Sequence, residues 1–179
     1  MKLLPKRIGT ALLCFCLACL LAVPAFPRSD DGERDVIFAR SDDGEINVII
    51  TVAESLFTTL KEREHRLVWG LLTEKSRRTI ADDTYKSVSA AGGGYSREQV
   101  EADFIRGGSV AEAYWRGYLQ TFDPDHALTQ STWSMGLVKN DRAEIKLLYK
   151  RSEKPAVLKM FKEGGSWKFG LVESFWSRK

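Results

Sequence analysis

The sequence predicts an α+β fold, with helices in the first part of the chain and a four-stranded antiparallel sheet in the last part. Two observations predict it. Apolar residues recur at three- and four-residue steps from Ile46 to Leu60, which is the period of an amphipathic helix. From Ser131 onward apolar residues instead alternate, with short polar turns between the runs, as in half-buried strands. We expect the helices to pack on one face of the sheet.

A charged and then apolar leader precedes this domain. Three basic residues lie within the first seven positions, residues 8–23 carry no charge, and small residues precede a cleavage site after Ala25. The pattern predicts a signal peptide over residues 1–25 and export to the periplasm or out of the cell. Two alternatives stay open. Lipid attachment at Cys19 fits the lipoprotein pattern poorly, and an uncleaved anchor needs about 20 apolar residues.

Removal of the leader changes the composition that bears on function. The chain has 27 Lys and Arg against 24 Asp and Glu, and residues 1–25 hold three of the basic side chains and all three cysteines (Cys14, Cys16 and Cys19). The remaining 154 residues are neutral and free of cysteine. A neutral chain lacks the surplus of basic side chains that binds nucleic acid or anionic membrane. We therefore expect no binding to nucleic acid, and contact with a membrane only through the leader. Without thiols, and with two histidines 61 positions apart, we expect no metal and no cofactor.

The segment of residues 26–44 contains a repeated polar motif. Arg-Ser-Asp-Asp-Gly-Glu occupies residues 28–33 and again residues 40–45. A calcium site is not favoured, because the EF-hand loop needs acidic ligands at alternate positions and a distal bidentate Glu. We interpret the motifs as Asp-rich turns, the second of which caps the first helix, with Asp42 and Glu45 at capping-box spacing.

The first helix is followed by a short helical turn and a second capped helix. The first helix ends in a run of alternating charge, in which Glu62 and Arg66 are four residues apart. Residues 67–72 predict a short buried turn of helix, after which Thr73 caps residues 74–80. Three basic side chains follow this cap: Lys75, Arg77 and Arg78. They could bind an anion, although a solvated helix face is the more common meaning of such a run.

Two later helices are predicted from capping boxes. Ser96 with Gln99 and Ser109 with Glu112 have the required spacing, and each pair opens a short helical pattern. The three glycines at positions 92–94 predict a loop before them. A phosphate-binding loop is not favoured because neither a preceding strand nor a Gly-Lys-Ser/Thr motif is present.

Four alternating runs predict an antiparallel meander. The alternating residues are Trp133, Met135 and Leu137; Ile145, Leu147 and Tyr149; Ala156, Leu158 and Met160; and Trp167, Phe169, Leu171, Glu173 and Phe175. Polar turns at residues 139–142 and 163–166 close the first and last hairpins.

Residues 68–77, Val-Trp-Gly-Leu-Leu-Thr-Glu-Lys-Ser-Arg, and residues 162–171, Lys-Glu-Gly-Gly-Ser-Trp-Lys-Phe-Gly-Leu, follow this helix-then-sheet order. Together they resemble exported members of the nuclear transport factor 2-like, or cystatin-like cone, superfamily. The resemblance implies one cone-like domain over residues 45–179, with a curved sheet and a pocket on its concave side. Members include isomerases, dehydratases, ligand carriers and assembly modules, so the fold does not select the function.

We expect the concave pocket to be mostly apolar. Its predicted lining is Trp133, Met135, Tyr149, Trp167, Phe169, Leu171, Glu173, Phe104 and Tyr114. Glu173 is the only ionisable group in its row, where it could act as a general acid or base; the alternative is a carboxylate near water at the strand end. His126, in the turn-forming sequence Asp-Pro-Asp-His, would assist it, or is an exposed loop histidine. No serine-nucleophile motif is present.

The opposite face of the sheet predicts an interface. Its apolar residues are Leu148, Val157, Phe161, Val172 and Trp176. Because an apolar patch on an outer face usually marks a contact surface, we expect a homodimer through this face or a cover formed by residues 36–38.

These patterns favour an exported, non-catalytic binding module for a small apolar ligand or an envelope protein partner. One alternative is an acid/base enzyme, isomerase- or dehydratase-like, that uses Glu173. The other is an assembly module of an envelope complex. Binding is favoured because only one acid is predicted to face the pocket, whereas acid/base enzymes of this fold generally need at least two cooperating polar groups.

Overall fold

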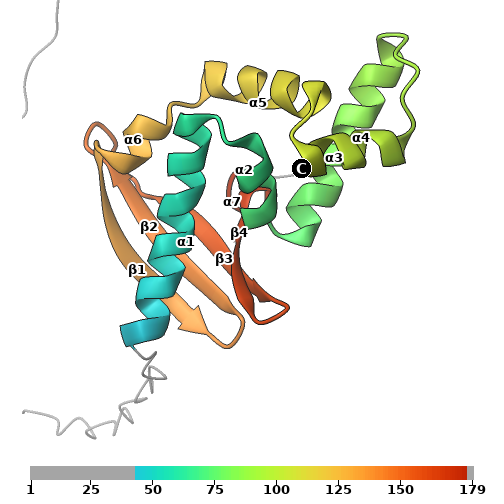
Figure 1. Ribbon diagram of the computed structural model, residues 1–179. Helices are drawn as coiled ribbons and strands as arrows, with labels where there is room; N and C mark the ends of the chain where they lie inside the picture. The colour runs from blue at the N-terminus through green and yellow to red at the C-terminus, as the bar shows by residue number, and fades with distance from the viewer. Residues whose placement is uncertain (1–42, 177–179) are drawn as a thin grey trace, which may run out of the picture. The chain divides into compact units, whose positions relative to one another are not determined.

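The computed structural model describes residues 43–176, which form an α+β unit with helices packed against a C-terminal sheet, as predicted (Figure 1). The helices are α1 (Asp43–Glu62), α2 (His65–Leu71), α3 (Glu74–Ala90), α4 (Arg97–Arg106), α5 (Ser109–Thr121), α6 (Pro124–Leu128) and α7 (Leu171–Phe175). The strands are β1 (Ser131–Lys139), β2 (Arg142–Tyr149), β3 (Ala156–Glu163) and β4 (Ser166–Gly170), paired in chain order. The predicted signal peptide, the cysteines, the Asp42 cap and residues 36–38 lie outside the described residues.

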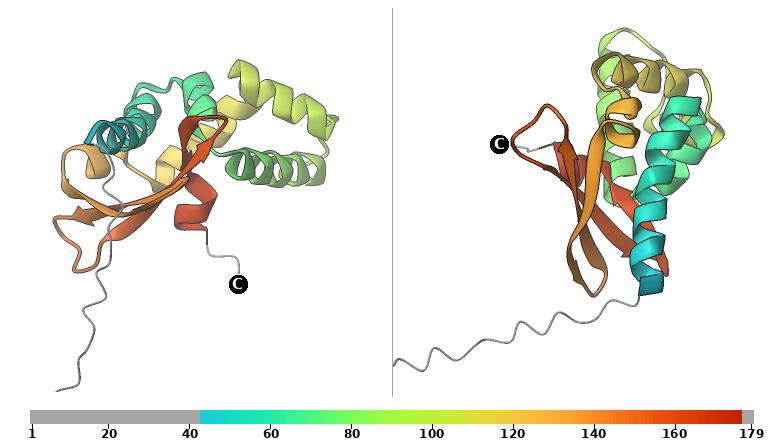
Figure 2. Two further views of the ribbon diagram at one scale, coloured as in Figure 1. Left: turned by 90° about the horizontal axis from the view of Figure 1, so that it is seen from below. Right: turned by 90° about the vertical axis from the view of Figure 1, so that its left-hand side faces the viewer.

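Helix α1 lies across the inner face of the sheet, because its predicted apolar stripe is buried there (Figures 1 and 2). The fully buried stripe residues are Ile49, Ala53, Leu56, Phe57 and Leu60. At the start of the helix, Glu45 accepts hydrogen bonds from Lys162 Nζ (2.8 Å) and Trp167 Nε1 (3.2 Å). The bond from Lys162 holds the pKa of Glu45 below its ordinary value. Glu45 therefore joins α1 to the β3–β4 hairpin.

The first helix ends earlier than predicted. Arg63 has a left-handed backbone (φ 61°), so α1 stops at Glu62 and a new helix begins at His65. The prediction that Glu62 and Arg66 share one helical face is therefore wrong, since Arg66 belongs to α2. The prediction of a cap at Thr73 is confirmed, because its side chain accepts a hydrogen bond from Ser76 N.

The strand register places alternating residues on the inner face, with one exception in β1. Trp133 pairs with Leu147 and Met135 with Ile145, but the register then shifts and Val138 pairs with Ala143. Leu137, which was predicted to continue the inward row, is consequently 55% exposed. A β-bulge of this kind inserts a residue and reverses the alternation beyond it.

The last predicted strand is wrong beyond Gly170. Residues 171–175 form the helix α7, so Glu173, Val172 and Phe175 do not lie on the sheet, and Trp176 follows the helix. Ser174 Oγ accepts from Lys159 N (2.8 Å) and donates to Gly170 O (2.6 Å), which replaces the next step of the β3–β4 ladder. A side chain at Gly170 would lie 2.7 Å from the Phe161 ring, so the close turn requires glycine here.

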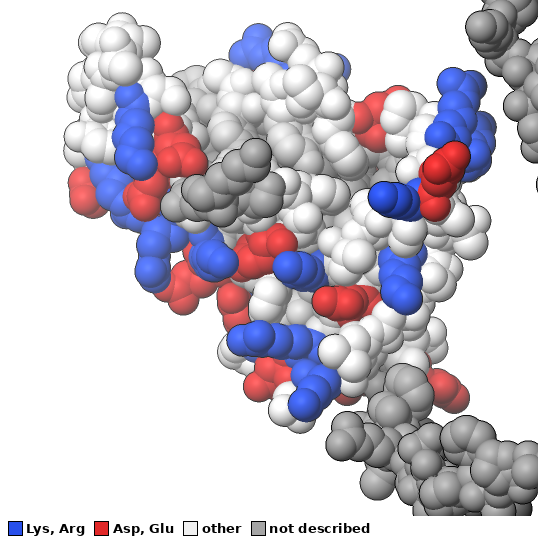
Figure 3. Space-filling model, turned by 180° about the vertical axis from the view of Figure 1, so that it is seen from behind, with Lys and Arg blue, Asp and Glu red and all other residues white. Residues whose placement is uncertain are grey.

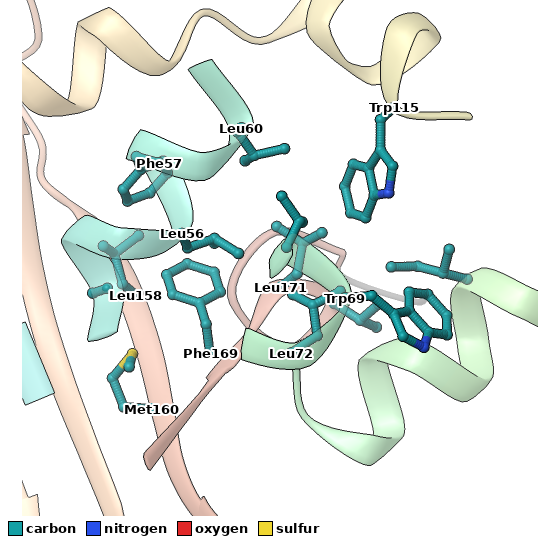
Figure 4. Close-up of a cluster of buried hydrophobic side chains, with 14 of the residues drawn as sticks. Leu56, Phe57, Leu60, Trp69, Leu72, Trp115, Leu158, Met160, Phe169 and Leu171 are labelled. Carbon is teal, nitrogen blue, oxygen red and sulfur yellow. The ribbon is translucent and has the colours of Figure 1, made fainter. Parts of the chain in front are cut away.

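One continuous cluster of buried aliphatic and aromatic side chains fills the space between the sheet and the helices (Figure 4). Phe57 is its centre, with ring centroids 5.7 Å from those of Phe122, Trp133 and Phe169. A second group begins where Trp69 stacks on Phe104 at 4.4 Å. Contacts through Tyr114, Trp115 and Tyr118 then join this group to Phe122. The helices and the sheet therefore share one core.

The two later helices begin in different ways. The Ser96–Gln99 capping box is confirmed. The Ser109–Glu112 box is wrong, because Gly108 is the N-cap of α5 and Ser109 is already its first residue. Asp103 Oδ1 accepts the hydrogen bond from Ala111 N (2.8 Å) instead.

Asp103→Ala is expected to lower the free energy of unfolding by about 1–2 kcal/mol, because the carboxylate supplies the missing cap of α5. Ser109→Ala is the matched control and should change it by less than about 0.5 kcal/mol. Urea unfolding followed by circular dichroism measures both. Equal losses in the two variants would show that Asp103 does not cap the helix.

Candidate functional site

The residues of the predicted apolar pocket do not meet in one open cavity. Phe104, Phe169 and Leu171 are fully buried and Trp167 is nearly so. Trp133 and Met135 pack against the same core. The remaining three, Tyr114, Tyr149 and Glu173, line three different surface grooves. The inner side of the sheet is occupied by α1, whose Phe57 contacts Trp133 and Phe169 directly.

Glu173 takes part in a network that joins α7 to the start of α3. Its carboxylate accepts from Ser76 Oγ (2.7 Å) and from Thr73 Oγ1 (3.1 Å). Ser76 Oγ in turn accepts from Val172 N (3.1 Å), and Thr73 N donates to Phe169 O (3.0 Å). We name these bonds the Thr73–Ser76–Glu173 network. The arrangement holds the carboxylate with two hydroxyl donors in a half-buried position.

The two histidines lie apart from Glu173 and from each other. His126 is exposed, with Nε2 3.8 Å from Asp123 Oδ2 and its ring 5.0 Å from that of Tyr149. His65 is half-buried on α2, where burial lowers its pKa. Within residues 43–176, no three His, Cys, Asp or Glu side chains gather as a metal site would need.

The outer face of the sheet carries charged side chains among the apolar residues that were predicted to form a patch there. Leu148, Val157 and Phe161 lie on it, whereas Val172 is buried on α7. Acidic and basic side chains are interspersed over the back of the molecule (Figure 3). Arg142, for example, lies over the Phe161 ring at 5.9 Å. Homodimerisation through this face stays a prediction.

An apolar groove that was not predicted lies between α3 and α5. Its volume is about 400 Å³. The lining residues are Asp83, Thr84, Ser87 and Val88 of α3, Tyr95 of the following loop, and Ser109, Val110, Ala113 and Tyr114 of α5. A side chain at Gly93 would overlap Val88 Cγ1 at 2.4 Å, so glycine lets the loop fold back against α3.

The chain shows no significant match to family models, curated proteins or solved structures.

Polar atoms within the groove are few but distinctive. Thr84 is 8% exposed, and its Oγ1 is buried without a hydrogen-bond partner in the described part of the chain. Tyr114 forms the opposite wall, edge-on to Phe104 and Trp115. Burial raises the pKa of the Tyr114 hydroxyl, so the tyrosine stays neutral. The groove thus has mostly apolar walls, and the oxygen of Thr84 is buried beneath its surface.

A sequence signal for this groove was present in α3. Ile80, Thr84 and Val88 lie at four-residue steps, which places Thr84 on the buried stripe of the helix. A hydroxyl in an apolar stripe indicates either a bond to the preceding turn or an unfilled site. Only the structure shows that Thr84 Oγ1 makes no such hydrogen bond to the preceding turn.

Proposed function

We propose that the protein is an exported, non-catalytic binding module that holds a small apolar ligand in the α3–α5 groove. The observation that carries the proposal is the mostly apolar groove of about 400 Å³ between α3 and α5. Ligand pockets commonly enclose about 300–1,000 Å³ and combine apolar walls with few polar groups, as this groove does.

The surroundings of Glu173 support binding over acid/base catalysis. Both of its oxygens already accept from Thr73 or Ser76, and His126 lines a different groove. General acid/base catalysis requires a proton-transfer group within reach of a substrate and of any assisting group. The geometry of Glu173 instead suits a structural role.

Export and family membership are part of the same proposal. The leader over residues 1–25 supports export. The order of helices followed by a four-stranded antiparallel sheet supports membership of the nuclear transport factor 2-like superfamily. In that case the ligand site lies among the helices, because α1 fills the concave side of the sheet.

Binding of a neutral apolar probe tests the proposed function. N-phenyl-1-naphthylamine fluorescence should rise when the full chain is added, and Ala113→Phe should reduce its affinity at least about tenfold by filling the groove. Ala90→Phe is the matched control, since Ala90 is exposed on α3 and does not line the groove. The proposal fails if the probe does not bind or if both variants bind it equally.

Thr84→Val tests the buried Thr84 hydroxyl separately. The variant is expected to unfold at higher urea, with about 1 kcal/mol more stability, because it removes a buried unsatisfied hydroxyl. A loss of stability would instead show that the Thr84 hydroxyl already has a partner in solution.

A further inference from the structure

A second groove, between α2, α3 and α4, gathers four arginines. Arg66 comes from α2, Arg77 and Arg78 from α3, and Arg97 from α4. The groove has a volume of about 670 Å³ and also contains Glu74, Glu101 and the apolar residues Trp69 and Ile105. It is separate from the α3–α5 groove of the proposed function.

The basic run predicted on α3 is divided between two surfaces. Lys75 lines the groove beside α7 and the outer face of the sheet, whereas Arg77 and Arg78 line the arginine groove. The run is therefore not one uniformly solvated helix face. Two of its members are held next to cations from other helices.

Two of the four guanidinium groups are neutralised by carboxylates. Arg78 pairs with Glu74 in the same helix. Arg97 donates to Asp82 (2.6 Å) and Glu101 (2.8 Å), and the bond to Asp82 makes the largest contribution to raising its pKa. These pairs use both acidic side chains that line the groove.

The other two guanidinium groups lack a carboxylate partner within residues 43–176. No ion pair or hydrogen bond joins Arg66 or Arg77 to another described side chain, and Arg77 is half-buried. Arg66 is exposed, so its guanidinium group is accessible from solvent. An oxyanion in the groove would gain favourable charge interactions with both guanidinium groups.

We propose that Arg66 and Arg77 bind a small oxyanion, the phosphate or carboxylate group of a ligand, in this groove. Guanidinium groups present paired N–H donors that match the oxygens of phosphate and carboxylate, and such charge-assisted bonds are stronger than neutral ones. Ile105, which is 55% exposed, offers an apolar contact to the rest of the ligand.

Titration of the full chain with inorganic phosphate or succinate at low ionic strength, followed by isothermal calorimetry, tests this site. Arg66→Gln and Arg77→Gln should each weaken binding by about tenfold or more, since one charge-assisted interaction is lost. Lys75→Gln is the matched control: it removes one positive charge from α3, the helix of Arg77, but Lys75 lines another groove, so binding should weaken less than about twofold.

The results separate the sources of the oxyanion and the ways the inference can fail. Binding of either free anion identifies a soluble ligand, whereas co-sedimentation only with phosphatidylglycerol vesicles, lost in Arg77→Gln, identifies a lipid headgroup. Absence of binding to all three probes would overturn the inference. An equal loss in Lys75→Gln and Arg77→Gln would also overturn it, by showing a diffuse charge effect. Neither result would change the expected binding of the neutral probe in the α3–α5 groove, so the proposed function is tested separately.

Discussion

Replacing Phe57 with alanine is expected to lower the free energy of unfolding by about 3–5 kcal/mol. Phe57 is fully buried and its ring contacts Phe122, Trp133 and Phe169, which belong to three separate parts of the chain. Its removal would leave a cavity where α1, the α5–α6 connection and the sheet meet. Urea unfolding followed by tryptophan fluorescence and circular dichroism measures the loss.

Phe175→Ala is the matched control for this prediction. Phe175 lies on α7, is 39% exposed, and has ring centroids 6.4 Å from Phe122 and Phe169. Its truncation should cost less than about 1 kcal/mol, because partly exposed side chains leave smaller cavities. If the two variants lost equal stability, Phe57 would not be the centre of the core.

Thr73→Val is expected to cost about 2–3 kcal/mol, because it disrupts two interactions with one change. The α3 N-cap to Ser76 N is lost, and the half-buried Glu173 carboxylate loses one of its two hydroxyl donors. Thermal and urea unfolding measure the effect. A double-mutant cycle with Glu173→Ala should show a coupling energy of at least about 0.5 kcal/mol.

Thr79→Val provides the comparison, since Thr79 is half-buried in the same helix but takes no part in the Thr73–Ser76–Glu173 network. It should change stability by less than about 1 kcal/mol. If the changes in unfolding free energy caused by Thr73→Val and Glu173→Ala were additive, the two residues would not be coupled. Glu173 would then again be a candidate general acid or base.

Local patterns predicted most of the fold. The α1 stripe, the Thr73 cap, the Ser96–Gln99 box and the four strand starts depend on neighbouring residues, so the sequence alone indicates them. The errors came from tertiary contacts. Residues 171–175 fit a strand by alternation, but Ser174 closes the end of the β3–β4 ladder and α7 forms instead.

The candidate site was much less predictable than the fold. Alternation correctly placed Trp167 and Phe169 on the inner face, but it cannot show that Phe57 fills the space in front of them. Similarly, Thr84 and Tyr114 lie 30 positions apart in the sequence. The packing of α3 against α4 and of α4 against α5 brings them to one groove.

The Thr73–Ser76–Glu173 network also bears on the order in which the chain acquires structure during synthesis. Thr73 and Glu173 are 100 positions apart, and residue 72 forms its bridge with residue 169. Contacts of such long sequence separation form late, because a large loop must close first. The start of α3 therefore gains its full set of bonds only after nearly the whole described domain has been made. Until then the helices lack the attachment to β4 and α7 that fixes them on the sheet.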